Sequence, residues 1–344
     1  MRLDIICNDG SPIGVTEKSI SGEDGRLGVG GAELALLTLC KVWTDAGYDV
    51  RLYNSPTHPN ASCFEQLPID AFVPEDSRDA VIVFRSPNER LKDTTKGLKI
   101  WMSCDQRTVG DFRAFAPRVD KIVTISPYHS DYFAKMYGIV NTIPIDLPVR
   151  TWEYDLSVSK VPKRCIFNSM PDRGIKQLHA AWALIVRDVP DAHLVITSDW
   201  RLWNTWADVE AIRPHKMMFA RQSNVTYLGA VKRAELVQHE LEAQVHLYPC
   251  SYEELFCIST AETQVAGAIP ITTDFGALRT TNMGHIVLGS PFTPEWNTEF
   301  TTKAVEMLSD QDKLRESAKM LQDKAIERFS PKRILEEWNQ KVFS

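Results

Sequence analysis

Two glutamates, Glu254 and Glu262, stand with seven residues between them in the run EELFCISTAE. The run follows an apolar segment, Val245–Tyr248, that has the length and composition of a buried strand. It ends shortly before Gly267, and glycine is typical of the position just past a helix. The pattern therefore predicts a helix over 256–266, with Glu254 in the turn before it and Glu262 about two turns inside it.

The start of this helix carries groups that can bind an anion. No Ser, Thr, Asp or Asn stands directly before Phe256, so about four backbone N–H groups lack a side-chain partner. Ser259 and Thr260, in the first turn, are small enough for a ligand to come close. A helix start of this kind at the edge of a sheet is suited to a pyrophosphate.

The two acids suit different partners. A carboxylate is repelled by a pyrophosphate, so Glu254 is expected to meet hydroxyl groups or N–H donors instead. Glu262 offers two oxygens to a pair of hydroxyls, as acidic residues do at the ribose of dinucleotide sites. The alternative is that both glutamates are surface charges in water, which is the usual state of a glutamate.

A basic turn follows the first predicted strand of the second half of the chain, at 164–168. The sequence NSMPDRGIK places Arg173 and Lys176 after the carboxyl end of that strand. Arginine can bind a phosphate with two N–H groups, and lysine can bind it as a point charge. The alternative is an ordinary turn, because Pro-Asp-Arg-Gly is a good turn sequence by itself.

A glycine-rich loop, LGVGGAE, precedes the first long predicted helix at 32–46. Gly30 and Gly31 let the backbone approach a ligand, and the N–H groups of the helix start can bind an anion or a sugar oxygen. The loop is not a dinucleotide fingerprint, because Glu33 stands where the third glycine belongs. A flexible hinge is the alternative interpretation.

Short apolar runs alternate with helical patterns along the chain, which predicts parallel sheets covered by helices on both faces. The 344 residues suffice for two domains, and the segment 147–162 separates two such series. Ligands of these sheets bind at the carboxyl ends of the strands, so a site in a cleft between two Rossmann-like domains is expected. The strands are predicted at 3–8, 48–53, 80–84, 98–102, 121–125, 164–168, 192–197, 225–228, 245–248 and 269–273, and the helices at 32–46, 130–137, 176–189, 233–243, 256–266 and 312–343.

Charge and composition disfavour several classes of function. The formal net charge of −6 gives no general footprint for nucleic acid. No apolar run approaches the ~20 residues of a membrane span, and the N-terminus lacks the features of a signal peptide, so a soluble, cytoplasmic protein is expected. Seven cysteines without CxxC pairs and eight dispersed histidines indicate reduced thiols and no metal site.

Several segments together resemble the retaining GT-B glycosyltransferases of family 4, the glycosyl transferases group 1 type. The spacing of Glu254 and Glu262, followed by GAIP at 267–270, resembles the E-x7-E motif and the following strand of that family. The GGAE loop with GYDV at 47–50 resembles its first strand–helix unit. The segments that resemble its second domain and final crossover helix are DRG at 172–174, PDAHL at 190–194, NVTYLG at 224–229 and the stretch 328–338.

The resemblance implies a fold and a division into domains. The fold class is α/β with GT-B architecture, in which two Rossmann-like doubly wound domains face each other across a cleft and a C-terminal helix crosses back to the first domain. Residues 1–155 would form the acceptor-binding domain and residues 156–325 the nucleotide-sugar-binding domain. Residues 326–344 would form the crossover helix that packs on the N-terminal domain.

The same resemblance implies roles for individual residues. Glu262 binds the ribose hydroxyls, and Glu254 faces the donor sugar. Arg173 takes the position of the family's phosphate-binding lysine. The other residues implied at the donor site are Gly30, Gly31 and Lys176, together with Leu255, Phe256 and Cys257 through their backbone amides.

Two departures from the family pattern bear on catalysis. The family's arginine six residues before the glycine of the basic turn is Asn168 here, so half of a pair of cations is missing unless Lys176 supplies it. The family's first-domain histidine near the donor sugar has no match. Asp105, after a predicted strand, is the candidate in its place, and a turn stabilised by the Asp side chain is the alternative.

The expected activity is metal-independent transfer of a sugar, with retention of configuration, from a UDP- or GDP-sugar to a hydroxyl acceptor, without a cofactor. The implied catalytic residues are Glu254, Arg173 and Asp105. The acceptor is a glycan, a lipid-linked sugar, a small molecule or, less in keeping with the acidic charge, modified DNA. The alternatives are a nucleotide-sugar-binding protein without turnover, favoured by Asn168 and by the missing histidine, and a Rossmann oxidoreductase, which the broken glycine fingerprint disfavours.

Overall fold

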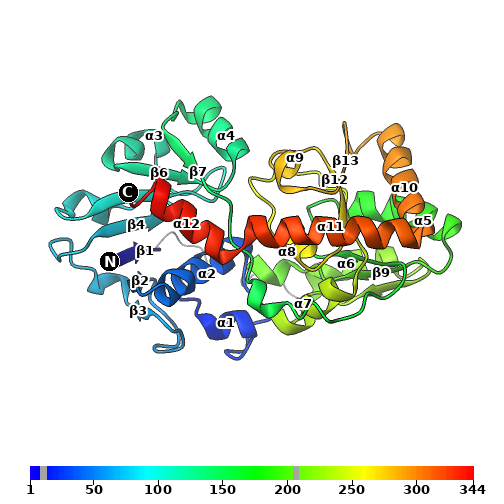
Figure 1. The fold of residues 1–344 in the computed structure, drawn as a ribbon, viewed down its shortest axis with the longest axis horizontal. Helices are drawn as coiled ribbons and strands as arrows, with labels where there is room; N and C mark the ends of the chain where they lie inside the picture. The colour runs from blue at the N-terminus through cyan, green and yellow to red at the C-terminus, as the bar shows by residue number, and fades with distance from the viewer. Residues whose placement is uncertain (8–13, 204–208) are drawn as a thin grey trace. The chain divides into compact units, whose positions relative to one another are not determined.

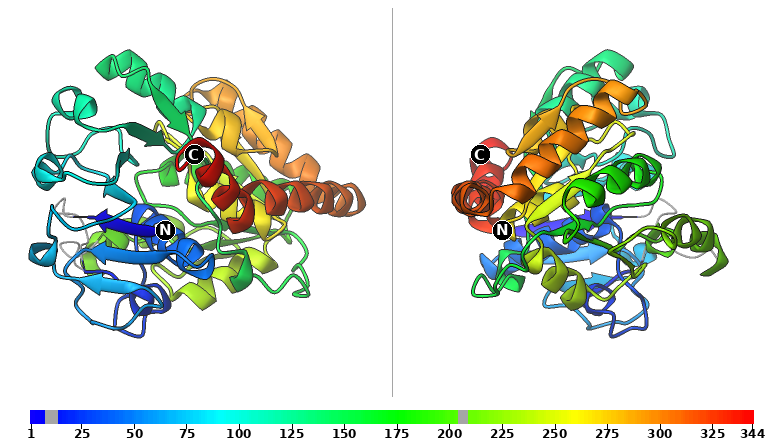
Figure 2. Two further views of the ribbon diagram at one scale, coloured as in Figure 1. Left: turned by 60° about the vertical axis from the view of Figure 1, so that its left-hand side comes forward. Right: turned by 90° about the vertical axis from the view of Figure 1, so that its right-hand side faces the viewer.

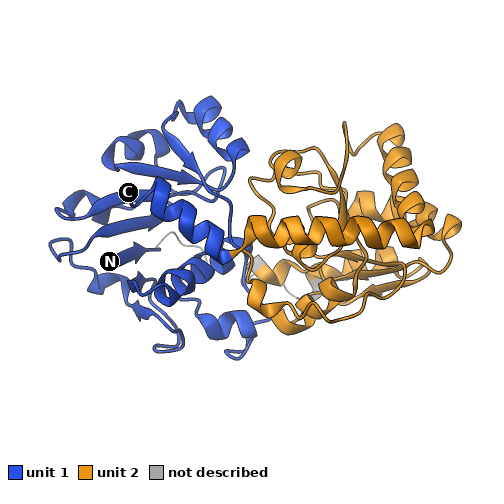
Figure 3. Cartoon of the chain, viewed as in Figure 1, with its two compact units in different colours: residues 1–148, 331–344 blue, residues 149–330 orange. Residues whose placement is uncertain are grey.

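The computed structural model of the protein describes residues 1–7, 14–203 and 209–344. The chain forms two compact units: unit 1 comprises residues 1–148 and 331–344, and unit 2 comprises residues 149–330 (Figures 1 and 3). The first boundary falls inside the segment 147–162, which the sequence indicates as a linker. The domain boundaries expected from the sequence, after residues 155 and 325, lie a few residues away from these.

Unit 1 is built on a sheet of seven parallel strands in the order β3-β2-β1-β4-β5-β6-β7. Every residue of the central strand β4 is buried, as expected for a parallel strand covered on both faces. The strands are β1 Arg2–Ile6, β2 Asp49–Tyr53, β3 Glu65–Leu67, β4 Ala80–Phe84, β5 Leu98–Met102, β6 Lys121–Thr124 and β7 Thr142–Pro144, and the helices are α1 Glu17–Ser21, α2 Gly31–Asp45, α3 Phe112–Phe115, α4 Pro127–Tyr137 and α12 Pro331–Lys341.

Helices pack against this sheet in two groups. α3 and α4 surround Trp101 of β5, whose ring centre lies 4.8 Å from that of Phe112 and 5.5 Å from that of Phe133. α2 packs on β2 and α12 packs on α2, where the rings of Trp43 and Trp338 meet edge to face with centres 5.1 Å apart. The C-terminal helix therefore belongs to unit 1, as the GT-B resemblance implies.

Unit 2 is built on a sheet of six parallel strands in the order β10-β9-β8-β11-β12-β13. α5 and α10 pack together on one face, and α8 and α11 pack together on the other (Figure 2). In the described part of the chain, no helix is both long and apolar enough to cross a membrane. The strands are β8 Arg164–Phe167, β9 His193–Ile196, β10 Val225–Tyr227, β11 Val245–Tyr248, β12 Ile269–Thr273 and β13 His285–Val287, and the helices are α5 Ile175–Asp188, α6 Arg213–Phe219, α7 Arg233–Glu242, α8 Ile258–Val265, α9 Leu278–Thr281, α10 Pro294–Ser309 and α11 Gln311–Phe329.

The structure differs from the predicted elements at several places. The stretch predicted as one helix over 312–343 is two helices, α11 and α12, because Pro331 begins a new helix and cannot continue the old one. The helix predicted from residue 256 begins at Ile258, since Cys257 has a φ of 74° and lies outside helical geometry. The predicted elements do not include α10 or the edge strands β3, β7 and β13. Asn8, predicted to end the first strand, lies outside the described residues.

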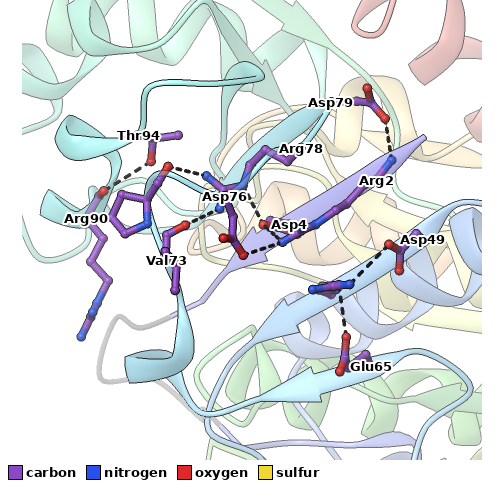
Figure 4. Close-up of polar contacts among 12 residues, drawn as sticks. Arg2, Asp4, Asp49, Glu65, Val73, Asp76, Arg78, Asp79, Arg90 and Thr94 are labelled. Carbon is purple, nitrogen blue, oxygen red and sulfur yellow. Dashed lines mark hydrogen bonds and ion pairs between the residues drawn. The ribbon is translucent and has the colours of Figure 1, made fainter.

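A buried ion pair anchors β1 in unit 1 (Figure 4). Arg78 donates from Nε to Asp4 Oδ2 at 2.6 Å, and neither side chain is exposed. Arg78 also donates to the backbone oxygens of Val73 and Pro74, at 2.5 and 2.9 Å, and Arg2 pairs with the second oxygen of Asp4 at 3.0 Å. The charge of Asp4 is thereby offset inside the protein, and β1 is tied to the loop before β4.

Replacing Arg78 with Met is expected to lower the free energy of unfolding by about 3–5 kcal/mol, because Asp4 stays buried with only the partly exposed Arg2 to offset it. Arg90→Met is the matched control, since Arg90 pairs with the exposed Asp70 at 2.5 Å and surface pairs contribute about 0–1 kcal/mol. Urea denaturation followed by circular dichroism measures both variants. Equal losses in the two would show that the buried pair has no special structural role.

Candidate functional site

The polar loops that the sequence singles out in unit 2 follow neighbouring strands of its sheet. The segment 168–174 follows β8, the segment 249–257 follows β11, and these two strands are adjacent. Because the strands are parallel, both loops leave the same edge of the sheet, where ligands of such sheets bind. The basic turn and the turn that carries Glu254 are therefore neighbours in space.

Gly174 lets these two loops approach closely. Its φ is 107°, and a Cβ placed on it would lie 2.0 Å from the backbone oxygen of Pro249, so only glycine fits there. The guanidinium carbon of the preceding Arg173 lies 3.4 Å from the centre of the Tyr252 ring, a cation–π contact. Arg173 is thus held against the loop that carries Glu254.

Glu254 is held by a tyrosine at the end of β11. Tyr248 donates its hydroxyl hydrogen to Glu254 Oε1 at 2.6 Å, and Ser169 Oγ lies 3.1 Å from the same hydroxyl. Burial raises the pKa of the Glu254 carboxyl, while the charge of Arg173 and the bond from Tyr248 oppose that rise. The structure therefore brings together Glu254 and Arg173, two of the three predicted catalytic residues.

α8 starts two residues later than predicted, but its start lacks a side-chain cap, as predicted. Cys257 precedes Ile258, and no side-chain hydrogen bond caps this helix. Among the described residues, no acceptor is paired with the backbone N–H groups of Phe256 and Cys257. The side chains of Leu255, Phe256 and Cys257 are buried, so a ligand at this turn would meet their backbone.

Glu262 lies inside α8 and is bound by an arginine that the sequence analysis did not identify. Its side chain is buried, and its Oε1 lies 2.7 Å from Nη2 of Arg233, the first residue of α7. Arg233 also bonds Glu153 Oε2 through Nε at 2.7 Å. Burial is tolerated by these charges because each has an opposite charge in contact.

A third acid, Glu240 of α7, is fully buried beside this pair. Its Oε2 accepts a hydrogen bond from the Tyr154 hydroxyl at 2.7 Å, and its Oε1 accepts one from Asn168 Nδ2 at 2.6 Å. Burial, and next the negative charge of Glu262, raise the pKa of Glu240 to about 8, although Arg233 opposes the rise. Glu240 therefore keeps its proton to a higher pH than an ordinary carboxyl does.

The sequence analysis left two positions for a second cation, Asn168 and Lys176, and both have other neighbours in the structure. The amide of Asn168 is bonded to the buried Glu240. Lys176 is exposed in the first turn of α5. The pKa of His215 is lowered first by the burial of His215 and second by the positive charge of Lys176. Arg173 is the cation that the structure places beside Glu254.

In unit 1, a second polar cluster forms where strands end. Arg85 directly follows β4 and has a φ of 66°, which is unusual for a residue with a side chain. Its Nη1 lies 2.8 Å from Glu33 Oε1, and its Nε lies 2.6 Å from Asp105 Oδ2. Glu33 is in the first turn of α2, two residues after Gly31, the first residue of that helix. Arg85 therefore joins the glycine loop to Asp105, the third predicted catalytic residue.

Arg85 and Arg233 are the residues that the sequence-based prediction lacks. Both come shortly after a strand, so attention to polar residues at the carboxyl ends of strands could have found them. Their partners are far away along the chain, since Glu33 is 52 positions from Arg85 and Glu153 is 80 positions from Arg233. Ion pairs between residues so far apart along the chain produce no recognisable pattern in the local sequence.

The fold matches that of solved glycosyltransferases. No protein-family model matches the sequence, and no curated protein matches it. Sucrose-phosphate synthase from Thermosynechococcus elongatus matches with a TM-score of 0.74 over 98% of this chain and 97% of that chain, at 15% identity. A glycosyltransferase from Rickettsia africae matches with a TM-score of 0.71 over 99% and 97%, at 14% identity. Anabaena HepE, in complex with UDP-glucose, matches with a TM-score of 0.68 over 99% of both chains, at 14% identity.

The chain has the GT-B fold. The predicted fold class is thereby confirmed, because the likeness covers almost the whole chain and includes both sheets. At sequence identities this low the likeness concerns the fold, so activity has to be argued from the residues themselves. In GT-B terms, Arg173, Glu254 and the Arg233–Glu262 ion pair belong to the C-terminal unit, and the Arg85 cluster belongs to the N-terminal unit.

The raised pKa of Glu240 predicts a pH dependence of stability. The folded protein keeps this proton up to about pH 8, whereas the unfolded chain releases it near 4.5, so the folded state binds more protons between these values. The free energy of unfolding of unit 2 is therefore expected to fall as pH rises through this window, by at most about 1.4 kcal/mol per pH unit from this group. Glu240→Gln imitates the neutral acid and removes that slope.

Denaturant titrations of wild type and Glu240→Gln at about pH 5 and about pH 8 measure the effect as a difference. The nearby Lys160, whose pKa burial lowers to about 7, titrates in both proteins, so its contribution largely cancels in that difference. A difference that stays constant with pH would show that Glu240 is ionised in the folded protein.

Proposed function

We propose that this protein is a glycosyltransferase that moves a sugar from a nucleoside-diphosphate sugar to a hydroxyl acceptor with retention of configuration. The observation that carries the proposal is that the positive charge of Arg173 acts on the Glu254 carboxyl beside the uncapped start of α8, at the carboxyl edge of a sheet in a GT-B fold. UDP and GDP are the proposed nucleotides. HepE, which shares the fold, was solved in complex with UDP-glucose.

In this proposal, unit 2 binds the donor. The carboxylate of Glu262 accepts hydrogen bonds from the ribose hydroxyls, and Glu254 accepts them from the sugar. Arg173 binds the diphosphate, together with the backbone N–H groups before α8. The further proposed donor contacts are Lys176 in unit 2, the amides of Leu255, Phe256 and Cys257, and Gly30, Gly31 and Asp105 in unit 1.

The proposed step uses no metal and no cofactor. The bond between the anomeric carbon and the diphosphate oxygen breaks, and the acceptor oxygen bonds to the same carbon from the same face. The proton of the acceptor hydroxyl passes to the leaving phosphate oxygen. Arg173 and the N–H groups at the start of α8 stabilise the negative charge that grows on the diphosphate.

A second candidate is a protein that binds a nucleotide sugar without transferring it. Asn168 favours this candidate, because it is neutral and bonded to Glu240 and so adds no positive charge beside Arg173. For an active enzyme, we propose a glycan, a lipid-linked sugar or a small molecule as the acceptor. Modified DNA fits a net charge of −6 less well, and a salt-sensitive gel shift would reveal it.

Nucleoside diphosphates are expected to raise the Tm of the protein, by mass action on the folded state, in a thermal-shift panel of UDP, GDP, ADP and CMP with and without sugars. Arg173→Met should weaken diphosphate binding about 10-fold or more, the value of a hydrogen bond to a charged group. Arg187→Met is the matched control, because Arg187 is exposed at the end of α5 and pairs with Asp188. Equal weakening in the two variants would remove Arg173 from the site.

Turnover distinguishes the two candidates. With the nucleotide sugar that binds best, the enzyme should release free sugar and nucleoside diphosphate slowly, and Glu254→Gln should reduce this hydrolysis about 100-fold while the donor still binds. NMR of the anomeric proton of a transfer product tests retention. Tight binding without any turnover would favour the second candidate, and failure to bind any nucleotide would contradict both.

A further inference from the structure

Arg233, the first residue of α7, is a buried charge to which the proposed function assigns no role. Its side chain is 10% exposed and contacts two carboxylates. Nε donates a hydrogen bond to Glu153 Oε2, and Nη2 forms an ion pair with Glu262 Oε1, each at 2.7 Å. Nη2 also lies 3.3 Å from the hydroxyl of Tyr154. A buried guanidinium is tolerated only when its charge and N–H groups are satisfied in this way.

The other charged groups of this cluster leave Glu262 dependent on Arg233. Glu153 has a second arginine, because Arg150 bonds its Oε1 at 2.5 Å. Glu240 is itself an acid, whose neutral form burial favours, so it offers no positive charge to Glu262. In the described part of the chain, Arg233 is the cation within ion-pair distance of Glu262.

The two oxygens of Glu262 have different surroundings. Oε1 faces Arg233, whereas among the described residues no side chain bonds Oε2. Glu262 also stands about one turn beyond Ile258, the first residue of α8, whose uncapped start is the proposed diphosphate site. A fixed carboxylate with one oxygen available is suited to accept a hydrogen bond from a hydroxyl.

We propose that Arg233 is a positioning residue of the nucleotide site, which holds Glu262 by Oε1 so that Oε2 accepts a hydrogen bond from the ribose. The inference rests on the proposed function, because it requires that a nucleoside diphosphate binds at α8. Arginine suits the task, since its planar group contacts Glu153 and Glu262 through different nitrogens at once, a geometry that a lysine ammonium does not reproduce. The site then selects ribonucleotides over 2′-deoxyribonucleotides.

The test compares these two kinds of nucleotide by isothermal titration calorimetry at about pH 7, below the raised pKa of Glu240. UDP, GDP and their 2′-deoxy forms are titrated into wild type, Arg233→Met, Arg233→Lys and Glu262→Gln. Wild type is expected to bind the ribonucleotide about 10-fold or more tightly than its deoxy form. Arg233→Met and Glu262→Gln should each reduce this ratio to about 2 or less, and the double variant should reduce it no further.

Arg233→Lys covers the case in which Arg233→Met does not fold, because it keeps the positive charge. It should reduce the ratio about threefold or more with an unchanged circular dichroism spectrum. Arg164→Met is the matched control, since Arg164 pairs with Glu242 in the same unit, and it should keep the wild-type ratio. The inference is overturned if every Arg233 variant that folds keeps the wild-type ratio of ribonucleotide to deoxynucleotide affinity. This includes the case in which both forms bind more weakly by the same factor. The proposed function would then still stand. Failure of wild type to bind any of the four nucleotides overturns the proposed function and the inference with it.

Discussion

The buried ion pair between Arg233 and Glu262 is the interaction on which the candidate site of unit 2 depends. Two charges removed from water are stable only if they meet each other and if their remaining hydrogen-bonding groups are satisfied. Arg233 begins α7, Glu262 lies inside α8, and Glu153, the second partner of Arg233, lies in a short helix at the start of unit 2. Their contacts hold these three segments together at one edge of the sheet. The same contacts therefore serve stability and, in our proposal, recognition of the nucleotide.

The carboxyl edge of unit 2 brings opposite charges near each other at two places. Arg173 and Glu254 lie where the loops after β8 and β11 meet, and Arg233 and Glu262 lie deeper, between α7 and α8. The start of α8 links the two, because its residues run from the turn of Glu254 to Glu262. Because the two acids stand at different points of this segment, one can face a sugar and the other a ribose in the proposed reaction.

The two α/β units could be predicted from the sequence because parallel strands buried on both faces leave continuous apolar runs, and β11 and β12 lie where those runs stand. The order of strands and loops along the chain is also enough to place Glu254 at a carboxyl edge. The first residue of α8 was not predictable in this way, since it depends on the positive φ of Cys257. Arg85 and Arg233 escaped prediction because their partners lie in other elements, and Asp105 could be named only as a strand-end residue without its arginine. The roles of these side chains depend on ion pairs between distant elements, and such pairs cannot be predicted from the spacing of residues along the chain.

The most direct test of the account is a crystal structure of the protein with UDP bound. We expect the ribose hydroxyls within about 3.2 Å of the Glu262 carboxylate, with the Arg233–Glu262 pair intact and the diphosphate at the start of α8 beside Arg173. A nucleotide bound away from α8, or a ribose that Glu262 does not contact, would contradict the account.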